Sequence, residues 1–292
     1  MTERAASRTA VLVCQARAVA DGRLAAGTFA DPVARDLLDA EERALVDSVR
    51  ADQPPADAGE RLGYELLART AVTIVPRTIA VDRAVREHRP DQVVILGAGL
   101  DTRAWRMPEL GKATVFEVDH PASQRDLLER TGPRQPLALR MAPVPVDLAT
   151  QTLAPGLMDA GFEPQAITTW IWEGVIPYLT ELQVRTTLRQ VSALSSPGSR
   201  LVASYQARSL PTQALRSALR ALLRLTRQPD PLADEPWRSL WRPADVRAML
   251  LENRFDVETD EDLLSLSDGL GLSVEGNTGS LRNGRVAIAT RR

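Results

Sequence analysis

The stretch Val93-Val94-Ile95-Leu96-Gly97-Ala98-Gly99-Leu100-Asp101-Thr102 decides the fold of this 292-residue chain. Four apolar, mostly β-branched residues run directly into a Gly-x-Gly turn, a pattern typical of a buried parallel strand that ends at a nucleotide site. Because Gly97 and Gly99 lack side chains, the backbone of this turn can lie against the ribose or phosphate of a ligand. The turn therefore predicts a parallel α/β sheet with a ligand at the end of its first strand.

The residues after the turn indicate which ligand it accepts. A dinucleotide-binding fingerprint would have a third glycine where this chain has Thr102. The chain also places Asp101 just beyond the turn, where a carboxylate would repel a pyrophosphate. These two residues favour S-adenosylmethionine, which carries a positive sulfonium and no phosphate.

Composition excludes several other classes of protein. The chain is 44% hydrophobic and 25% charged with a net charge of −2, as in ordinary globular proteins, so no nucleic-acid or membrane partner is expected. It has no run of about 18 apolar residues and no visible secretion signal, and we expect a cytoplasmic protein. One cysteine and two distant histidines predict neither a disulfide nor a metal site.

The chain divides at about residue 90. Residues 1–90 show helical spacing over 7–20, 32–50 and 60–88, which predicts an N-terminal helical lid. Residues 91–292 alternate between short apolar runs and helical stretches, which predicts a mostly parallel, doubly wound sheet. We place its seven strands near 93–96, 114–118, 143–146, 167–172, 200–206, 254–258 and 285–290, with helices near 121–131, 181–194 and 243–253. The last two strands could pair antiparallel, and a helical insertion with a basic stretch at 214–227 is predicted over 207–241.

Acidic residues follow several of these strands. In an open α/β sheet the ligand lies across the carboxyl ends of the strands, so side chains placed there are candidates for binding it. Glu117 and Asp119 end the second strand, where a carboxylate can accept hydrogen bonds from ribose hydroxyls. Asp147 follows the third strand beside Leu148, a pair suited to an adenine ring, and Glu173 follows the fourth.

The ordered set of motifs resembles the leucine carboxyl methyltransferase superfamily, and in particular its bacterial branch of O-methyltransferases of polyketide and other secondary metabolism. The resemblance covers most of residues 7–206. It rests on Leu96-Gly97-Ala98-Gly99-Leu100-Asp101-Thr102-Arg103, Phe116-Glu117-Val118-Asp119-His120-Pro121, Asp147-Leu148 and Glu173-Gly174-Val175-Ile176-Pro177-Tyr178-Leu179, with Arg77-Thr78 upstream and Ser204-Tyr205-Gln206 downstream. The family implies a class I methyltransferase fold, which is Rossmann-like, and S-adenosylmethionine as cofactor.

The resemblance also implies roles for individual residues. Arg77 should pair with the carboxylate of the cofactor, although Arg69 on the same predicted helix is an alternative. Glu173 and Tyr178 should border the methyl-transfer site. From its own position at the end of the fifth strand, Tyr205 could either hydrogen-bond an acceptor carboxylate or be an ordinary buried tyrosine. The remaining cofactor-binding candidates are Gly97, Ala98, Gly99, Asp101, Glu117, Asp119, His120, Asp147, Leu148 and Glu173. Trp170 and Trp172, which precede Glu173, fit either the core or an aromatic wall for the acceptor.

The predicted reaction is transfer of a methyl group to an oxygen of a small molecule, made by a monomer or homodimer. A carboxylate acceptor is ionised at pH 7 and needs no general base, whereas a phenol would benefit from one. The shortage of bases favours a carboxylate, with Glu173 as the one candidate base. An NAD(P)-dependent dehydrogenase and a non-catalytic S-adenosylmethionine-binding protein remain as alternatives.

Overall fold

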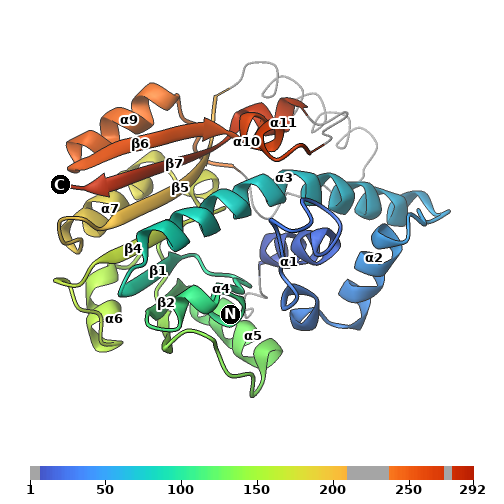
Figure 1. Cartoon of the computed structure of the whole chain (residues 1–292), viewed down its shortest axis with the longest axis horizontal. Coiled ribbons are helices and arrows are strands. Elements are labelled where there is room, and N and C mark those ends of the chain that lie inside the picture. Colours follow the sequence, from blue (N-terminus) through green and yellow to red (C-terminus); the bar gives the residue numbers. More distant parts are fainter. Residues whose placement is uncertain (1–6, 209–236, 273–277) are drawn as a thin grey trace.

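A seven-stranded sheet forms the centre of the computed structural model, which describes residues 7–208, 237–272 and 278–292 (Figure 1). The strands are β1 (Gln92–Leu96), β2 (Thr114–Asp119), β3 (Arg140–Pro145), β4 (Thr168–Trp172), β5 (Arg200–Gln206), β6 (Phe255–Asp262) and β7 (Gly284–Arg291). Their order across the sheet is β3-β2-β1-β4-β5-β7-β6. All seven predicted strands are therefore present.

The first five strands are parallel, and β7 runs antiparallel to both β5 and β6. The doubly wound sheet and the antiparallel pairing at its end are thus confirmed. From β1 the chain adds β2 and β3 on one side and then crosses to β4 on the other side. This reversal creates a crevice beyond the carboxyl end of β1, the usual ligand position in such sheets.

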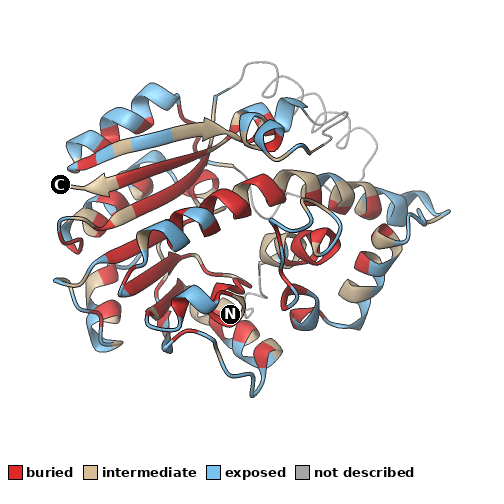
Figure 2. Ribbon diagram, viewed as in Figure 1, coloured by how far each residue is buried: buried red, intermediate tan, exposed pale blue. Residues whose placement is uncertain are grey.

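Helices cover both faces of the sheet, and its central strands β1, β2, β4 and β5 are almost entirely buried, whereas the edge strands β3 and β6 are partly exposed (Figure 2). The α-helices are α1 (Arg8–Ala20), α2 (Ala40–Arg50), α3 (Ala58–His88), α4 (Arg103–Arg106), α5 (Pro121–Thr131), α6 (Leu153–Asp159), α7 (Glu181–Ala193), α9 (Pro243–Glu252), α10 (Leu263–Gly269) and α11 (Thr278–Asn283). The short 3₁₀ helices are η1 (Ala34–Leu37), η2 (Pro108–Leu110) and η3 (Ile176–Tyr178). One apolar cluster joins α6, α7 and α9 to the sheet, and another joins α1–α5, α10 and α11 to its opposite face.

The N-terminal helices share the second cluster with the sheet. The long helix α3 runs from the α1–α2 pair across the sheet, as Figure 1 shows. A single helix was expected over 32–50, but the structure breaks it into η1 and α2. Asp39 ends the first piece because its side chain caps α2, in a capping box with Glu42. The division at residue 90 and the role of the N-terminal helices as a lid stay predictions.

Strand β3 begins three residues earlier than the sequence indicated. It contains Pro143 and Pro145, which lack the N–H that a central strand needs. The strand tolerates them because it lies at the edge of the sheet, with β2 as its one neighbour. The predicted insertion and its basic stretch fall on 209–236, outside the described residues.

Candidate active site

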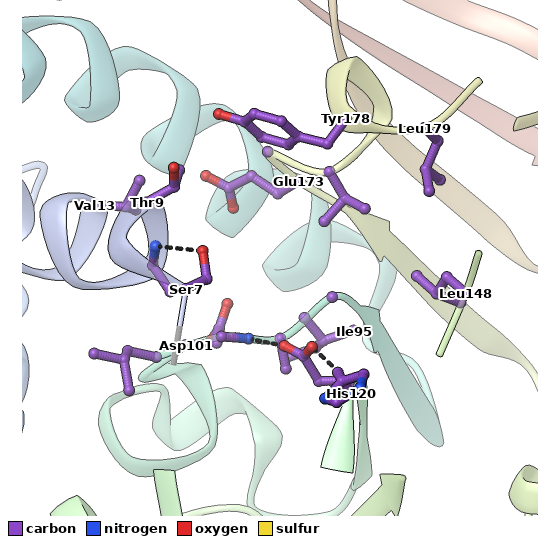
Figure 3. A pocket seen from close by; sticks show the side chains of 18 of the residues that line it. Ser7, Thr9, Val13, Ile95, Asp101, His120, Leu148, Glu173, Tyr178 and Leu179 are labelled. Carbon is purple, nitrogen blue, oxygen red and sulfur yellow. Dashed lines mark hydrogen bonds between the residues drawn. The ribbon is translucent and has the colours of Figure 1, made fainter. Parts of the chain in front are cut away.

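A cavity of about 350 Å³ opens at the carboxyl ends of β1, β2, β3 and β4. This volume is within the range of small-molecule sites, and the position is the crevice where the strand order reverses. Figure 3 shows Glu173 and Tyr178 near helix α1 on one side, and His120 and Leu148 toward the other end. The lining includes Ser7, Thr9, Ala10, Val13, Arg17, Arg77, Gly97, Ala98, Gly99, Asp101, Asp119, His120, Asp147, Leu148, Glu173, Tyr178 and Arg238.

The glycine turn is packed closely on both of its sides. Gly97 has φ +70°, and a Cβ built there would lie 2.3 Å from Cγ2 of Val175. Gly99 has φ +54°, and its Cβ would lie 2.9 Å from Cβ of Ala10. These positions require glycine for both the backbone conformation and the close approach of neighbouring atoms. The turn therefore leaves bare backbone facing the cavity.

Asp119 is fixed to this turn by hydrogen bonds. Its carboxylate accepts from the backbone N–H of Gly99 at 2.6 Å and from that of His120 at 2.6 Å. Burial raises the pKa of Asp119 above its usual value, and the two N–H donors act in the opposite direction. The side chain thus links the ends of β1 and β2 at the place predicted for a ribose.

At one end of the cavity, Glu173 lies between two arginines. It accepts from Nε of Arg77 at 2.7 Å and from a terminal nitrogen of Arg103 at 2.7 Å. Burial would raise the pKa of Glu173, but the two guanidinium groups outweigh it and hold that pKa well below its ordinary value. Within the described part of the chain, the terminal nitrogens of Arg77 donate to no residue, and they pass beside Gly174. That edge of the guanidinium suits a carboxylate ligand.

Most of the predicted site residues meet at this cavity. Asp147 and Leu148 lie after β3, where the Asp147 carboxylate accepts from the backbone N–H of Ala149 at 2.8 Å. His120 caps α5 through its Nδ1 atom, which accepts from the backbone N–H of Ala122 at 3.2 Å. Asp101 lines the cavity too, but its carboxylate is paired with Arg103.

Two predicted residues, Tyr205 and Glu117, do not line the cavity. Tyr205 is buried on the opposite side of β5 from Ser204, whose Oγ accepts from the backbone N–H of Gly174. The Tyr205 hydroxyl donates to Asp260 of β6 at 2.8 Å. We therefore correct its placement: it is a buried tyrosine away from the cavity, and its hydroxyl reaches past β7 to Asp260 on β6.

Glu117 is buried within β2, and its Oε1 has no hydrogen-bond partner among the described residues. Its side chain alternates with that of Val118 along the strand. Burial, with smaller contributions from the nearby charges of Asp101 and Asp119, raises the pKa of Glu117 well above its ordinary value. We therefore move it from the cofactor-binding set to the buried core.

Burial and position decide between the remaining candidates. Trp170 and Trp172 are fully buried in the cluster under α6, α7 and α9, so they are core residues. Arg69 is exposed and lies outside the lining, whereas Arg77 is part of it. Arg238 also lines the cavity, and Arg103 lies behind the lining, paired with Asp101 and Glu173; the sequence analysis gave neither arginine a role. Arg103 stands two residues from Asp101, a pairing that could have drawn attention to it.

Replacing Glu117 with glutamine is expected to make the protein more stable than wild type at alkaline pH. In the unfolded chain the carboxyl ionises above about pH 4.5, whereas in the fold its raised pKa lets it stay protonated to higher pH. Stability is therefore lost as pH rises from about 4.5 toward the folded pKa, by at most about 1.4 kcal/mol per pH unit. Urea unfolding of wild type and Glu117→Gln at pH 5 and pH 8 measures this difference.

The exposed residue Glu129 supplies the matched control, because Glu129→Gln makes the same chemical change at the surface. If the difference in unfolding free energy between Glu117→Gln and wild type were the same at pH 5 and pH 8, the raised pKa of Glu117 would be refuted.

The strand order β3-β2-β1-β4-β5-β7-β6, with a cavity where that order reverses, is that of a class I methyltransferase fold. Two solved structures share it over nearly the whole chain. A DUF574 family protein from Streptomyces avermitilis has a TM-score of 0.57 at 12% identity, covering 98% of each chain. A protein from Thermobifida fusca, provisionally described as a methyltransferase, has a TM-score of 0.53 at 17% identity and covers 95% of this chain and 94% of its own.

The chain belongs to the leucine carboxyl methyltransferase family, whose model matches residues 10–192. A relative from Mycolicibacterium paratuberculosis is 32% identical over 73% of this chain and 68% of its own length. Another from Parafrankia is 40% identical over 50% of this chain and 48% of its own. Both carry the provisional name of S-adenosyl-L-methionine-dependent methyltransferase. The match with the Parafrankia protein thus spans about half of that protein's length.

Proposed function

We propose that this protein is an S-adenosylmethionine-dependent O-methyltransferase acting on a carboxylate of a small molecule, of the kind made in secondary metabolism. When bound, the cofactor supplies a methyl group on a positively charged sulfur, already activated for displacement. The observation that carries the proposal is one cavity with Asp119 and the glycine turn in its middle and the Arg77–Glu173 pair at one end.

The residues of the cavity fit this cofactor from end to end. The free edge of the Arg77 guanidinium would take the carboxylate of its methionine part, and Asp119 would accept from its ribose hydroxyls. Asp147 and Leu148 would hold the adenine. Bare backbone at Gly97 and Gly99 would lie against the adenosine. A dehydrogenase is not favoured, because Thr102 and Asp101 stand where a pyrophosphate site needs glycine and no carboxylate.

The ion pairing of Glu173, the candidate base, favours a carboxylate acceptor. Glu173, the candidate base, is ion-paired twice and has a lowered pKa, so it is a poor proton acceptor. Direct displacement by an ionised carboxylate needs no base, and the protein's task is to hold the oxygen about 3–3.5 Å from the methyl carbon in line. The alternative acceptor, a phenol, would have to lose its proton elsewhere.

Arg238 adds a positive charge at the acceptor side. It lines the cavity, and its backbone N–H donates to the carbonyl of Pro177 at 2.6 Å, next to Tyr178. Among the described residues its side chain has no hydrogen-bond or ion-pair partner. A guanidinium in this position is suited to steering an anionic acceptor into the cavity.

Methyl transfer from labelled S-adenosylmethionine to a panel of aromatic and aliphatic carboxylic acids and phenols tests the proposal. We expect label in carboxylic acids, and alkaline treatment should release it as methanol because methyl esters hydrolyse and methyl ethers do not. Label in phenols alone would contradict the carboxylate proposal. Cofactor binding without transfer to any acceptor class would favour the non-catalytic alternative.

Replacing Glu173 with glutamine separates an electrostatic role from a general-base role. We expect kcat to fall by a similar factor at every pH between 6 and 9, because the carboxylate stays ionised over that range. The profile is measured with an acceptor identified by the panel, and Glu129→Gln serves as the exposed control. If kcat rose with pH in the wild type but not in Glu173→Gln, Glu173 would be identified as the general base.

The remaining expectations belong to the same proposal. No helix in the described part of the chain is long and apolar enough to span a membrane. We propose a cytoplasmic enzyme, as monomer or homodimer, that needs no metal ion.

A further inference from the structure

A buried arginine, Arg103, connects Asp82 to Asp101 and Glu173, which line the end of the cavity proposed for the amino-acid part of the cofactor. Its Nε donates to Asp82 at 2.7 Å, one terminal nitrogen pairs with Asp101, and the other donates to Glu173 at 2.7 Å. The backbone N–H of Arg103 also donates to Asp101 at 2.7 Å. With 3% of its side chain exposed, each nitrogen of the guanidinium faces a different buried acid. This arrangement fixes the acids relative to one another.

Glu173 is the acid that Arg103 shares with Arg77. Each arginine donates one hydrogen bond to it, Arg77 through Nε and Arg103 through a terminal nitrogen. A buried carboxylate that loses one of two cations holds the other more tightly, since leaving it uncompensated is costly. Without Arg103, Glu173 would therefore compete for the edge of Arg77 that faces the cavity.

We propose that Arg103 is a positioning residue that holds Glu173 and Asp101, so that the terminal nitrogens of Arg77 stay available to the carboxylate of the cofactor. The inference rests on the proposed function, because it concerns the amino-acid part of S-adenosylmethionine. Replacing Arg103 should therefore weaken the binding of the amino-acid part and leave the binding of the adenosine part unchanged. The end of the cavity proposed for adenosine is lined by Asp119, Asp147 and Leu148, whereas the side-chain partners of Arg103 among the described residues are Asp82, Asp101 and Glu173.

Two ligands, one with and one without the amino-acid part, test whether Arg103 acts on that part alone. S-adenosylhomocysteine contains it, whereas 5′-methylthioadenosine lacks it. For Arg103→Gln we expect affinity for S-adenosylhomocysteine to fall at least tenfold, with affinity for 5′-methylthioadenosine changing less than twofold. Isothermal titration calorimetry of the full chain gives both constants. An equal loss of both ligands would overturn the proposal, because a general disruption of the fold acts on both.

Arg106 provides a matched control within the same buried series of ion pairs. It pairs with Asp82 at 2.7 Å and with Asp31 at 3.4 Å, and contacts neither Glu173 nor Asp101. Arg106→Gln removes a buried arginine of similar surroundings. The ratio of the two ligand affinities should stay within twofold of wild type, even if the variant is less stable. A tenfold change in that ratio would refute the special position of Arg103.

The pH dependence of binding gives a second readout. The charged groups around Glu173 are Arg77 from α3, Arg103 from α4 and, at longer range, Arg17 from α1. In wild type Glu173 stays ionised, so we expect the ratio of the two affinities to be constant between pH 5.5 and 8. In Arg103→Gln its pKa should rise, and protonation toward pH 5.5 should release Arg77 and restore S-adenosylhomocysteine binding.

The double variant Arg103→Gln/Glu173→Gln should lose this pH dependence, because no acid is left to compete for Arg77. If the ratio of the two ligand affinities in Arg103→Gln did not change between pH 5.5 and 8, the proposal would be contradicted. If that variant does not fold, Arg103→Lys keeps the charge without the planar fork and should lower the ratio at least threefold. A wild-type ratio in Arg103→Lys would overturn the inference. Failure of the wild-type chain to bind S-adenosylhomocysteine would instead remove the proposed function itself.

Discussion

Replacing Arg77 with methionine is expected to weaken binding of S-adenosylhomocysteine roughly 100-fold. Removing one member of a buried, hydrogen-bonded charge pair typically costs about 2–5 kcal/mol, and 1.4 kcal/mol is a tenfold change in affinity. Arg77 is 14% exposed, and its terminal nitrogens are the donors proposed for the ligand carboxylate. Methionine keeps the length and apolar character of the side chain. Calorimetric titration with S-adenosylhomocysteine measures the loss.

Arg69→Met is the control for this prediction, because Arg69 lies on the same helix and is exposed away from the cavity. It should bind S-adenosylhomocysteine as wild type does. 5′-Methylthioadenosine, which has no carboxylate, should bind Arg77→Met within a few-fold of its wild-type affinity. Were Arg69→Met to lose as much affinity as Arg77→Met, the assignment of the carboxylate site to Arg77 would have to be abandoned.

Replacing Gly97 with alanine is expected to destabilise the protein by about 2–5 kcal/mol and to abolish measurable cofactor binding. The new Cβ would lie 2.3 Å from Cγ2 of Val175, and the residue would keep a positive φ of +70°. Left-handed strain costs about 1–2 kcal/mol for a residue other than glycine, and overpacking adds about 1–3 kcal/mol. Because Val175 lines the cavity, relief of the clash would displace part of the ligand site.

Two variants separate the clash from the backbone strain. Gly22 has a similar φ of +68°, and a Cβ placed there would meet no described atom within 4 Å, so Gly22→Ala should show the strain alone. In Gly97→Ala/Val175→Ala the γ carbons at 2.3 and 3.4 Å are gone, and part of the lost stability should return. Thermal unfolding of wild type and these three variants measures this. A double variant no more stable than Gly97→Ala would disprove the clash with Val175.

The strands could be predicted well because the sheet is covered on both faces. A parallel strand buried on both sides is a continuous apolar run, and 93–96 is one. The exception, the early start of β3 at Arg140, follows from its edge position, which lets an exposed arginine and two prolines enter the strand. The break in the predicted 32–50 helix depended on a side-chain cap at Asp39.

The site was predictable where its residues follow strands and less so where they meet across the fold. Asp119, Asp147 and Glu173 lie at or directly after the ends of β2, β3 and β4, and parallel topology gathers them at one edge. Arg103 acquires its role from Asp82 and Glu173, which are distant in sequence and unrelated in pattern. For Tyr205, a position near the end of a strand was not enough to predict a place in the site. It lies near the end of a strand, but the alternation of side chains turns it to the other face.

The most direct test of the central claim is calorimetric titration of the purified chain with S-adenosylhomocysteine and, separately, with NAD. We expect S-adenosylhomocysteine to bind one site per chain with micromolar affinity, and NAD to give no measurable heat of binding. The replacement of a third glycine by Thr102 and the proposed role of Arg77 in binding the ligand carboxylate both predict this preference. Binding of NAD with no binding of S-adenosylhomocysteine would contradict the account.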